Sequence, residues 1–196
     1  MERRLRVGAR VPVTRAEGPG ARYALWLQGC GIRCAGCCNP HLFEPKGGER
    51  VDPAVLLAEM AAVRGEIEGV TLLGGEPMDQ AGALVPLLQG ARGLGLSVML
   101  FSGFTLGELR ARADPAVRDV LALVDVLVDG RYDASQPEPD RSWAGSTNQR
   151  FHYLTDRYSP AIERPATGAP LRTVEVRLAL DGRLSANGWP VVGRRD

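Results

Sequence analysis

All four cysteines of this 196-residue chain lie within nine residues, at Cys30, Cys34, Cys37 and Cys38. Thiols so arranged could form disulfides or bind a metal ion or an iron–sulfur cluster. Disulfides between residues this close in sequence would close only very short loops and would stabilise the fold little. The vicinal pair Cys37 and Cys38 could also pair only with strain. The spacing therefore favours a metal or iron–sulfur site.

Two kinds of centre fit the cysteine loop. Structural zinc takes four ligands in a tetrahedral shell, and Cys38 or His41 could supply the fourth. Such sites usually draw ligand pairs from separate segments, whereas here every ligand comes from one loop, in which adjacent Cys37 and Cys38 are expected to point apart. A cubane iron–sulfur cluster has four corners, each normally bound by a thiolate. Three thiolates, from Cys30, Cys34 and Cys37, would leave one iron open for chemistry.

Alternating strands and helices must position this loop. Short apolar runs at residues 23–28, 69–73, 97–101 and 124–130 indicate strands, and the first of them ends at the cysteines. These runs show little polar alternation, which is typical of parallel strands that are buried on both faces. Helical stretches separate them, so the chain has the pattern of βαβ units with a parallel sheet.

The expected helices have recognisable first residues. Asp52 followed by proline is an N-cap with proline at the first helical position. Asp79 is expected to cap the next helix. Thr105 and Glu108 form a capping box, and Asp114 followed by proline begins a further short helix.

The ends of the chain and one long loop complete the expected domain, which we take to be a single one over residues 1–196. Residues 6–13 could add an edge strand. Residues 173–190 alternate in polarity, turn at Asp181 and Gly182, and indicate a C-terminal β-hairpin. Residues 133–149 are polar and proline-rich, and we expect them to form an exposed loop.

Composition narrows the possible partners. The chain is 44% hydrophobic and 24% charged, with a formal net charge of +1. This balance provides no strong field to attract nucleic acid or a membrane surface. No signal peptide and no apolar run of membrane-spanning length are recognisable. We therefore expect a cytoplasmic protein with reduced thiols.

Seven short segments give the chain a resemblance to a known superfamily. They are, in order, residues 18–22 (GPGAR), 25–30 (LWLQGC), 33–40 (RCAGCCNP), 74–77 (GGEP), 102–105 (SGFT), 125–130 (DVLVDG) and 145–150 (GSTNQR). A C-x-x-x-C-x-x-C loop after a first strand and G-G-E-P after the next resemble the radical S-adenosylmethionine superfamily. The full set is similar to the small activating enzymes of glycyl-radical enzymes, most of all to those of anaerobic ribonucleotide reductases.

The resemblance implies a fold and a chemistry. The fold would be α/β, a partial, open parallel β/α barrel with a C-terminal hairpin. The cofactors would be a [4Fe–4S] cluster and S-adenosylmethionine, which the reduced cluster cleaves to methionine and a 5′-deoxyadenosyl radical. That radical would abstract hydrogen from a glycine of a glycyl-radical enzyme partner. A flavodoxin or ferredoxin-type protein would donate the electron.

The resemblance also implies roles for particular residues. Cys30, Cys34 and Cys37, but not Cys38, would each bind one iron. Further cofactor contacts would come from residues at three successive strand ends, where parallel α/β folds bind ligands. These are Gly74, Gly75, Glu76, Pro77, Ser102 and Asp129. The glycines would let backbone approach the cofactor, and Glu76 would sit by the methionine amino group.

Other functions stay open on the sequence alone. The chain could be a stand-alone radical enzyme that modifies a peptide or small metabolite, or a non-catalytic iron–sulfur or zinc module. For the activating enzyme, residues 134–149 would be a docking element. Trp143 within it would then be either an exposed anchor or a side chain folded back onto the barrel.

Overall fold

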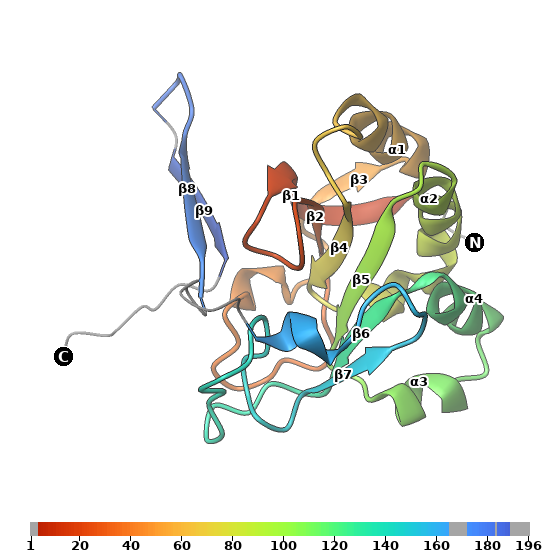
Figure 1. Ribbon diagram of the computed structural model, residues 1–196, viewed down its shortest axis with the longest axis vertical. Helices are drawn as coiled ribbons and strands as arrows, with labels where there is room; N and C mark the ends of the chain where they lie inside the picture. The colour runs from red at the N-terminus through yellow and green to blue at the C-terminus, as the bar shows by residue number, and fades with distance from the viewer. Residues whose placement is uncertain (1–3, 165–171, 183, 189–196) are drawn as a thin grey trace.

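The computed structural model describes residues 4–164, 172–182 and 184–188 (Figure 1). Within these residues a seven-stranded sheet has the order β3-β1-β2-β4-β5-β6-β7, and β8 and β9 form a separate pair. The four central strands are parallel: β2 (Arg22–Leu27), β4 (Gly69–Gly74), β5 (Ser97–Ser102) and β6 (Val126–Asp129). The antiparallel additions are β1 (Leu5–Thr14), β3 (Glu49–Val51) and β7 (Arg150–Tyr153).

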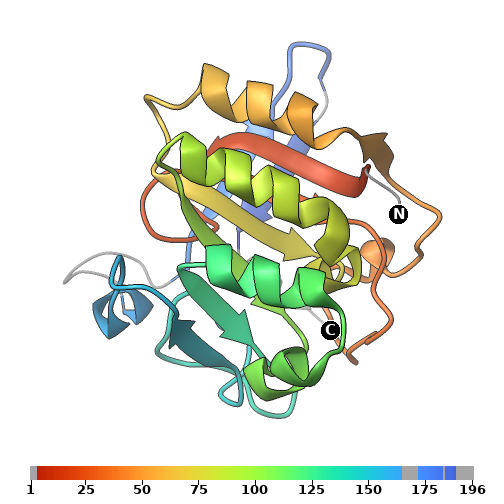
Figure 2. The same cartoon turned by 90° about the vertical axis from the view of Figure 1, so that its right-hand side faces the viewer.

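The main helices lie on one face of the sheet, as Figure 2 shows. They are α1 (Pro53–Ala62), α2 (Ala81–Gly93) and α4 (Pro115–Leu123), with the short α3 (Leu106–Ala111) after β5. Short 3-10 turns are η1 (Pro40–Leu42), η2 (Pro77–Gln80) and η3 (Pro160–Glu163). The hairpin of β8 (Val174–Leu178) and β9 (Leu184–Gly188) stands on the other side of the sheet (Figures 1 and 2).

Most expected helix starts are confirmed. Asp52 and Asp114 each accept a hydrogen bond from the backbone N–H two residues on, at 2.9 Å, and Thr105 and Glu108 form the capping box. The prediction for Asp79 was wrong, because a 3-10 turn precedes α2, which begins after Gln80. Glu76 caps that turn by accepting from Met78 N–H.

The parallel strands are buried on both faces, as their composition predicts. Tyr23, Leu25 and Leu27 of β2 belong to the large core between sheet and helices. Ala24 and Trp26 alternate with them and pack with Leu42 on the opposite face. A further cluster on the strands β5 and β6 contains Met99, Val126 and Val128, with aromatic residues around it. Because loops rather than helices cover this second face, it can hold a cavity.

The structure corrects two expectations, for residues 6–13 and for residues 133–149, and decides between the two alternatives left open for Trp143. Residues 6–13 lie inside β1. The short strand β3 pairs with its first residues, Leu5 to Val7, so β1 is at the edge of the sheet only beyond Val7. The polar segment 133–149 is partly buried, because its polar groups bond one another: Glu138, only 4% exposed, accepts from Asp140 and Arg141 N–H and pairs with the Arg141 guanidinium. Trp143 packs against the Met99 cluster rather than projecting into solvent.

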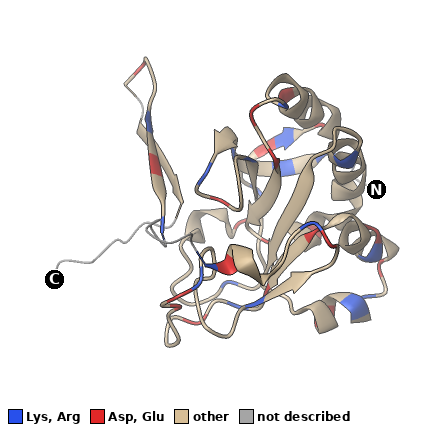
Figure 3. Ribbon diagram, viewed as in Figure 1, with Lys and Arg blue, Asp and Glu red and all other residues tan. Residues whose placement is uncertain are grey.

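The α/β class and the C-terminal hairpin are thus confirmed, while curvature of the sheet into an open barrel stays a prediction. The hairpin turn is closed by Gly182 N–H donating to Ala179 C=O at 2.9 Å, with Gly182 at φ +82°. Charges of both signs are interspersed over the elements (Figure 3). In the described ranges, no helix has the length and apolarity that a membrane crossing needs.

Candidate functional site

A cavity of about 550 Å³ lies on the face of the sheet opposite the helices. Its walls are the cysteine loop, the carboxyl ends of the central strands, the segment after β6, and the β8–β9 hairpin. The sequence-predicted residues that line it are Cys30, Cys34, Cys37, Gly74, Gly75, Glu76 and Ser102, together with Cys38. Folding therefore brings the cysteine loop and two later strand ends to one place, because parallel strands end at the same edge of a sheet.

The cysteine loop is held by hydrogen bonds at its base. Gly29 and Cys30 N–H donate to the carbonyls of Leu42 and Phe43, at 2.8 and 3.0 Å. The Gln28 side-chain amide donates to the carbonyl of Glu44 at 2.7 Å. These bonds close the loop at the end of β2, so the thiols project from a positioned segment.

The four thiols are free and differ in environment. Cys30, Cys34 and Cys37 are partly buried, and Cys38 is exposed. A hydrogen bond from Cys38 lowers the pKa of Cys37 to about 6, and Asn39 N–H also donates to its sulfur, at 3.4 Å. Burial raises the pKa of Cys30. The vicinal side chains thus contact each other, contrary to the expectation that they point apart.

The thiolate is the ligand form of cysteine, and the lowered pKa of Cys37 favours that form at this residue. Among the described residues, no three histidine, cysteine, aspartate or glutamate side chains are grouped so as to hold a single metal ion.

Gly74, the last residue of β4, and Gly75 after it allow two backbones to meet. Gly75 N–H donates to Leu27 C=O at 2.7 Å, and Glu76 N–H donates to Gly29 C=O at 2.8 Å. A Cβ on Gly75 would lie 2.2 Å from the Gly29 carbonyl oxygen, and Gly74 has φ +102°. The close approach seen here is to the base of the cysteine loop. Both glycines also line the cavity, and their approach to the cofactor stays a prediction.

Glu76 is the more deeply buried of two acids that line the cavity, with 1% of its surface exposed. One carboxylate oxygen accepts from Met78 N–H and the Ser102 hydroxyl, and the other accepts from Gly103 N–H, all at 2.9 Å. Burial raises its pKa to about 7, against the opposing effect of these three donors. Ser102 is thus a positioning residue for Glu76.

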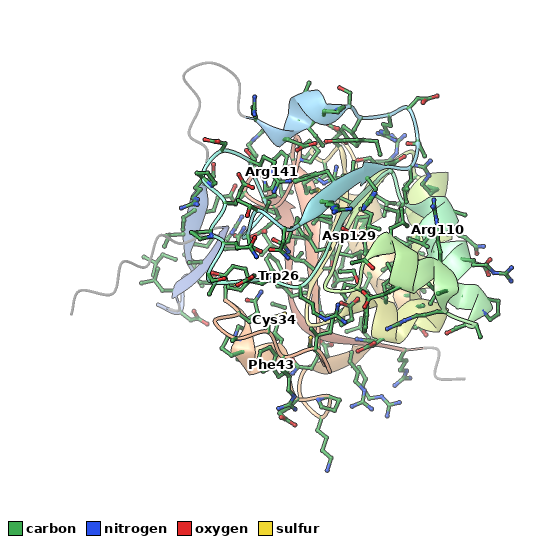
Figure 4. The ribbon with its side chains drawn as sticks, turned by 90° about the horizontal axis from the view of Figure 1, so that it is seen from below. Trp26, Cys34, Phe43, Arg110, Asp129 and Arg141 are labelled. Carbon is green, nitrogen blue, oxygen red and sulfur yellow. The ribbon has the colours of Figure 1, made fainter. Side chains whose placement is uncertain are left out.

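Asp129 does not line the cavity. Strand alternation turns Val126 and Val128 toward the inner cluster, so Asp129 faces the other side. Its carboxylate accepts from Leu106 N–H at the start of α3 and lies 2.8 Å from His152 Nε2. Figure 4 labels Asp129 near the helices, apart from Trp26 and Cys34. Pro77 begins the buried 3-10 turn and is likewise not a wall residue.

Several cavity residues were not expected from the sequence. Trp26 and Phe101 form apolar wall, and Trp143 and Gln149 close the side formed after β6. The Gln149 side chain accepts from Gly145 N–H and donates to Gly130 C=O, which orders the 145–150 turn. That segment was noted only as a motif, and nothing in it showed where its side chains would point.

Glu17 was also missed. It is 8% exposed, and burial raises its pKa. Its carboxylate accepts from Gly188 N–H and from the Asn187 amide, at 2.6 and 3.1 Å, so it joins the loop after β1 to the hairpin. The contact spans most of the chain, and local sequence carries no signal for it.

Comparisons with known proteins identify a family and similar chains. Residues 16–152 match the family described as a 4Fe-4S single cluster domain. The anaerobic ribonucleoside-triphosphate reductase-activating protein of Vibrio cholerae is 32% identical over 151 residues, which cover 74% of this chain and 95% of that protein. The protein of that name from Escherichia coli K12 is 31% identical over 150 residues, 73% and 95% of the two chains.

A weaker likeness is found among solved structures. QueE from Escherichia coli aligns with 52% of this chain and 54% of its own, at 21% identity and a TM-score of 0.43. A TM-score this low supports no argument about function.

Proposed function

The chain belongs to the 4Fe-4S single cluster domain family and to the anaerobic ribonucleoside-triphosphate reductase-activating proteins, and on that premise we propose that it is a radical S-adenosylmethionine activase. Its substrate is a glycine of a glycyl-radical reductase, from which it removes one hydrogen atom. The observation that carries this proposal is the shared cavity of the cysteine loop and Glu76.

The residues present fit the two cofactors. Cys30, Cys34 and Cys37 are soft thiol ligands on one held loop, and they would bind three irons of a [4Fe–4S] cluster. The apolar cavity beside these thiols would hold S-adenosylmethionine, since its volume of about 550 Å³ is typical of cofactor sites. The Glu76 carboxylate would accept from its amino group. When bound, these groups supply reductive cleavage of S-adenosylmethionine and removal of a hydrogen atom.

The protein contributes orientation and exclusion of water. The backbone hydrogen bonds of Gly75 and Glu76 join the end of β4 to the base of the cysteine loop. They therefore fix the position of the Glu76 carboxylate relative to the thiols. Trp26 and Phe101 make the wall apolar. In such surroundings, a buried carboxylate binds a cation more strongly than it would in water.

The proposal also covers the domain organisation, the shape of the sheet, the cellular location and the electron donor. We take residues 1–196 as one domain and the sheet as an open barrel, whose helices lie outside and whose cavity lies inside, as in β/α barrels that bind ligands at strand ends. The protein would work in the cytoplasm, where thiols stay reduced, and would receive its electron from a flavodoxin or ferredoxin-type donor.

Anaerobic reconstitution tests the function. Protein loaded with iron and sulfide, then given dithionite and S-adenosylmethionine, should release 5′-deoxyadenosine. With the anaerobic reductase of the same organism, electron paramagnetic resonance should show a glycyl radical, with about one S-adenosylmethionine consumed per radical. Multiple turnover of a small molecule without the reductase would instead indicate a stand-alone enzyme. Absence of any cleavage would leave a non-catalytic cluster module.

A further inference from the structure

The β8–β9 hairpin exposes its apolar side. Residues directly opposite in an antiparallel pair share a face, and the register pairs Val174 with Gly188, Val176 with Ala186 and Leu178 with Leu184. One face is therefore wholly apolar. Its large members are 43–72% exposed, and Leu180 in the turn is fully exposed. Of the six large hydrophobic residues exposed in the described part of the chain, only Val55 lies elsewhere.

The polar side of the hairpin faces the body. Glu175 accepts from Arg15 N–H at 2.7 Å, and Arg177 donates to the Val13 carbonyl at 2.9 Å. The Asn187 amide donates to the Thr14 hydroxyl at 2.9 Å and to Glu17. This orientation is the reverse of an ordinary surface hairpin, which buries its apolar face. An apolar face held outward by specific polar bonds marks a surface for another molecule.

The apolar face is continuous with the cofactor cavity. The hairpin borders the cavity that contains the cysteines with both of its faces: Val174, Ala186 and Gly188 of the apolar face line it, and so do Ser185 and Asn187 of the polar face. Figure 1 shows the hairpin projecting from the sheet on the side away from the helices. A protein that rests on the hairpin would therefore lie beside the cavity into which a reacting glycine must enter.

We infer that the apolar face of the β8–β9 hairpin is the docking surface for the reductase, which presents a complementary apolar rim around its glycine-bearing segment. This inference rests on the activase function proposed above. The family match ends at residue 152, so the hairpin lies outside the matched cluster domain and can serve recognition rather than cluster binding. A protein substrate needs such a surface, since its glycine must be held in the cavity while the rest of its mass stays outside.

The test uses a triple variant, Val176→Ser with Leu178→Ser and Leu184→Ser. All three side chains are exposed and none lines the cavity, so folding and the cofactor site should be unaffected. Val55→Ser is the matched control, because Val55 is a similarly exposed side chain on α1. Reconstituted proteins are titrated with the reductase, and glycyl radical and uncoupled 5′-deoxyadenosine are both measured.

We expect the triple variant to need more than tenfold more reductase for half-maximal radical formation, with uncoupled cleavage within twofold of wild type. The control should match wild type in both. An unchanged half-maximal concentration in the triple variant would overturn the inference. Wild-type protein that forms a dimer through this face, lost in the triple variant while reductase titration is unaffected, would overturn it in favour of a second copy.

Failure of the function itself would be visible separately. If wild type cleaves no S-adenosylmethionine, the activase proposal fails. Direct calorimetric titration of the reductase with the two variants then still decides whether the hairpin binds it: a loss of binding confined to the triple variant supports docking, and equal binding refutes it.

Discussion

The Glu76 carboxylate is buried and accepts hydrogen bonds from three donors, and both features affect its pKa. Its carboxylate is 1% exposed, and three hydrogen bonds hold it between the ends of β4 and β5. Burial nevertheless raises its pKa to about 7. Near neutrality the acid is therefore poised between its two forms, and a cationic amino group placed against it would favour the ionised one.

A pH dependence of stability follows from this pKa. The pKa of Glu76 in the folded protein lies above the ordinary value of 4.5, so protonated Glu76 contributes to the free energy of unfolding. This contribution is complete below about pH 4.5 and is lost as the pH rises through about 7. The cofactor-free protein should lose up to about 3 kcal/mol over this window, at 1.36 kcal/mol per pKa unit. Urea unfolding of wild type and Glu76→Gln at several pH values measures the loss. Parallel curves for the two proteins would show that Glu76 is not its source.

The cysteines give a second prediction at this scale. Cys37→Ala should abolish the cluster, because it removes one of the three thiols that would each bind an iron, whereas Cys38→Ala should keep most of the iron. Iron and sulfide content and the visible spectrum after anaerobic purification report the result. Complete loss of iron in Cys38→Ala, or stoichiometric zinc in wild type, would contradict the assignment of Cys30, Cys34 and Cys37 as ligands.

The junction between β4 and the cysteine loop is the element on which the site depends. Two backbone hydrogen bonds join Gly75 and Glu76 to Leu27 and Gly29, and no side chain fits between them. The parallel register places Leu27 opposite Gly74, so both strands end together. Any widening here would move the acid away from the thiols.

Gly75→Ala should therefore destabilise the protein by about 3 kcal/mol, as overpacking against backbone does, and should weaken S-adenosylmethionine binding in the same variant. Gly82→Ala is the control. Its added Cβ meets nothing within 4 Å inside α2, so it should stabilise by about 0.5–1 kcal/mol. Urea unfolding and cofactor titration test both. A Gly75→Ala protein with wild-type stability and affinity would show that the close approach is not required.

Over the whole molecule, the two faces of the sheet have separate tasks. Helices pack on one face and form the large core, while loops and the hairpin cover the other and enclose the cavity. The segment after β6 belongs to this second cover. Trp143 within it packs on the inner cluster and lines the cavity, so it is a wall residue and not a docking anchor.

Trp143→Ala should accordingly lower uncoupled S-adenosylmethionine cleavage and reductase activation together. It should also lower the free energy of unfolding by about 2 kcal/mol, less than the range for removing a fully buried tryptophan, because Trp143 is only partly buried. Product assays with and without reductase, alongside urea unfolding, distinguish a wall residue of the cavity from a docking anchor. Normal uncoupled cleavage with impaired activation would restore the docking role.

The sequence alone determined what depends on local chemistry. Cysteine spacing indicated the cluster loop, apolar runs indicated the parallel strands, and the Asp52, Thr105 and Asp114 caps marked three helices, because capping bonds form within a few residues. Strands as short as β3 and β7 carry too little pattern to be recognised.

The tertiary structure decided what depends on direction and on contacts between distant segments. Asp129 and Ser102 both end parallel strands and are paired in register, so they share a face of the sheet. Only Ser102 lines the cavity, next to Glu76, because the Asp129 carboxylate is held by Leu106 N–H and lies against His152. The local runs at β5 and β6 are apolar on both faces, so their composition does not show which residue points inward. The outward apolar face of the hairpin depends on bonds from Glu175, Arg177 and Asn187 to the region 13–17. Only folding brings those segments together.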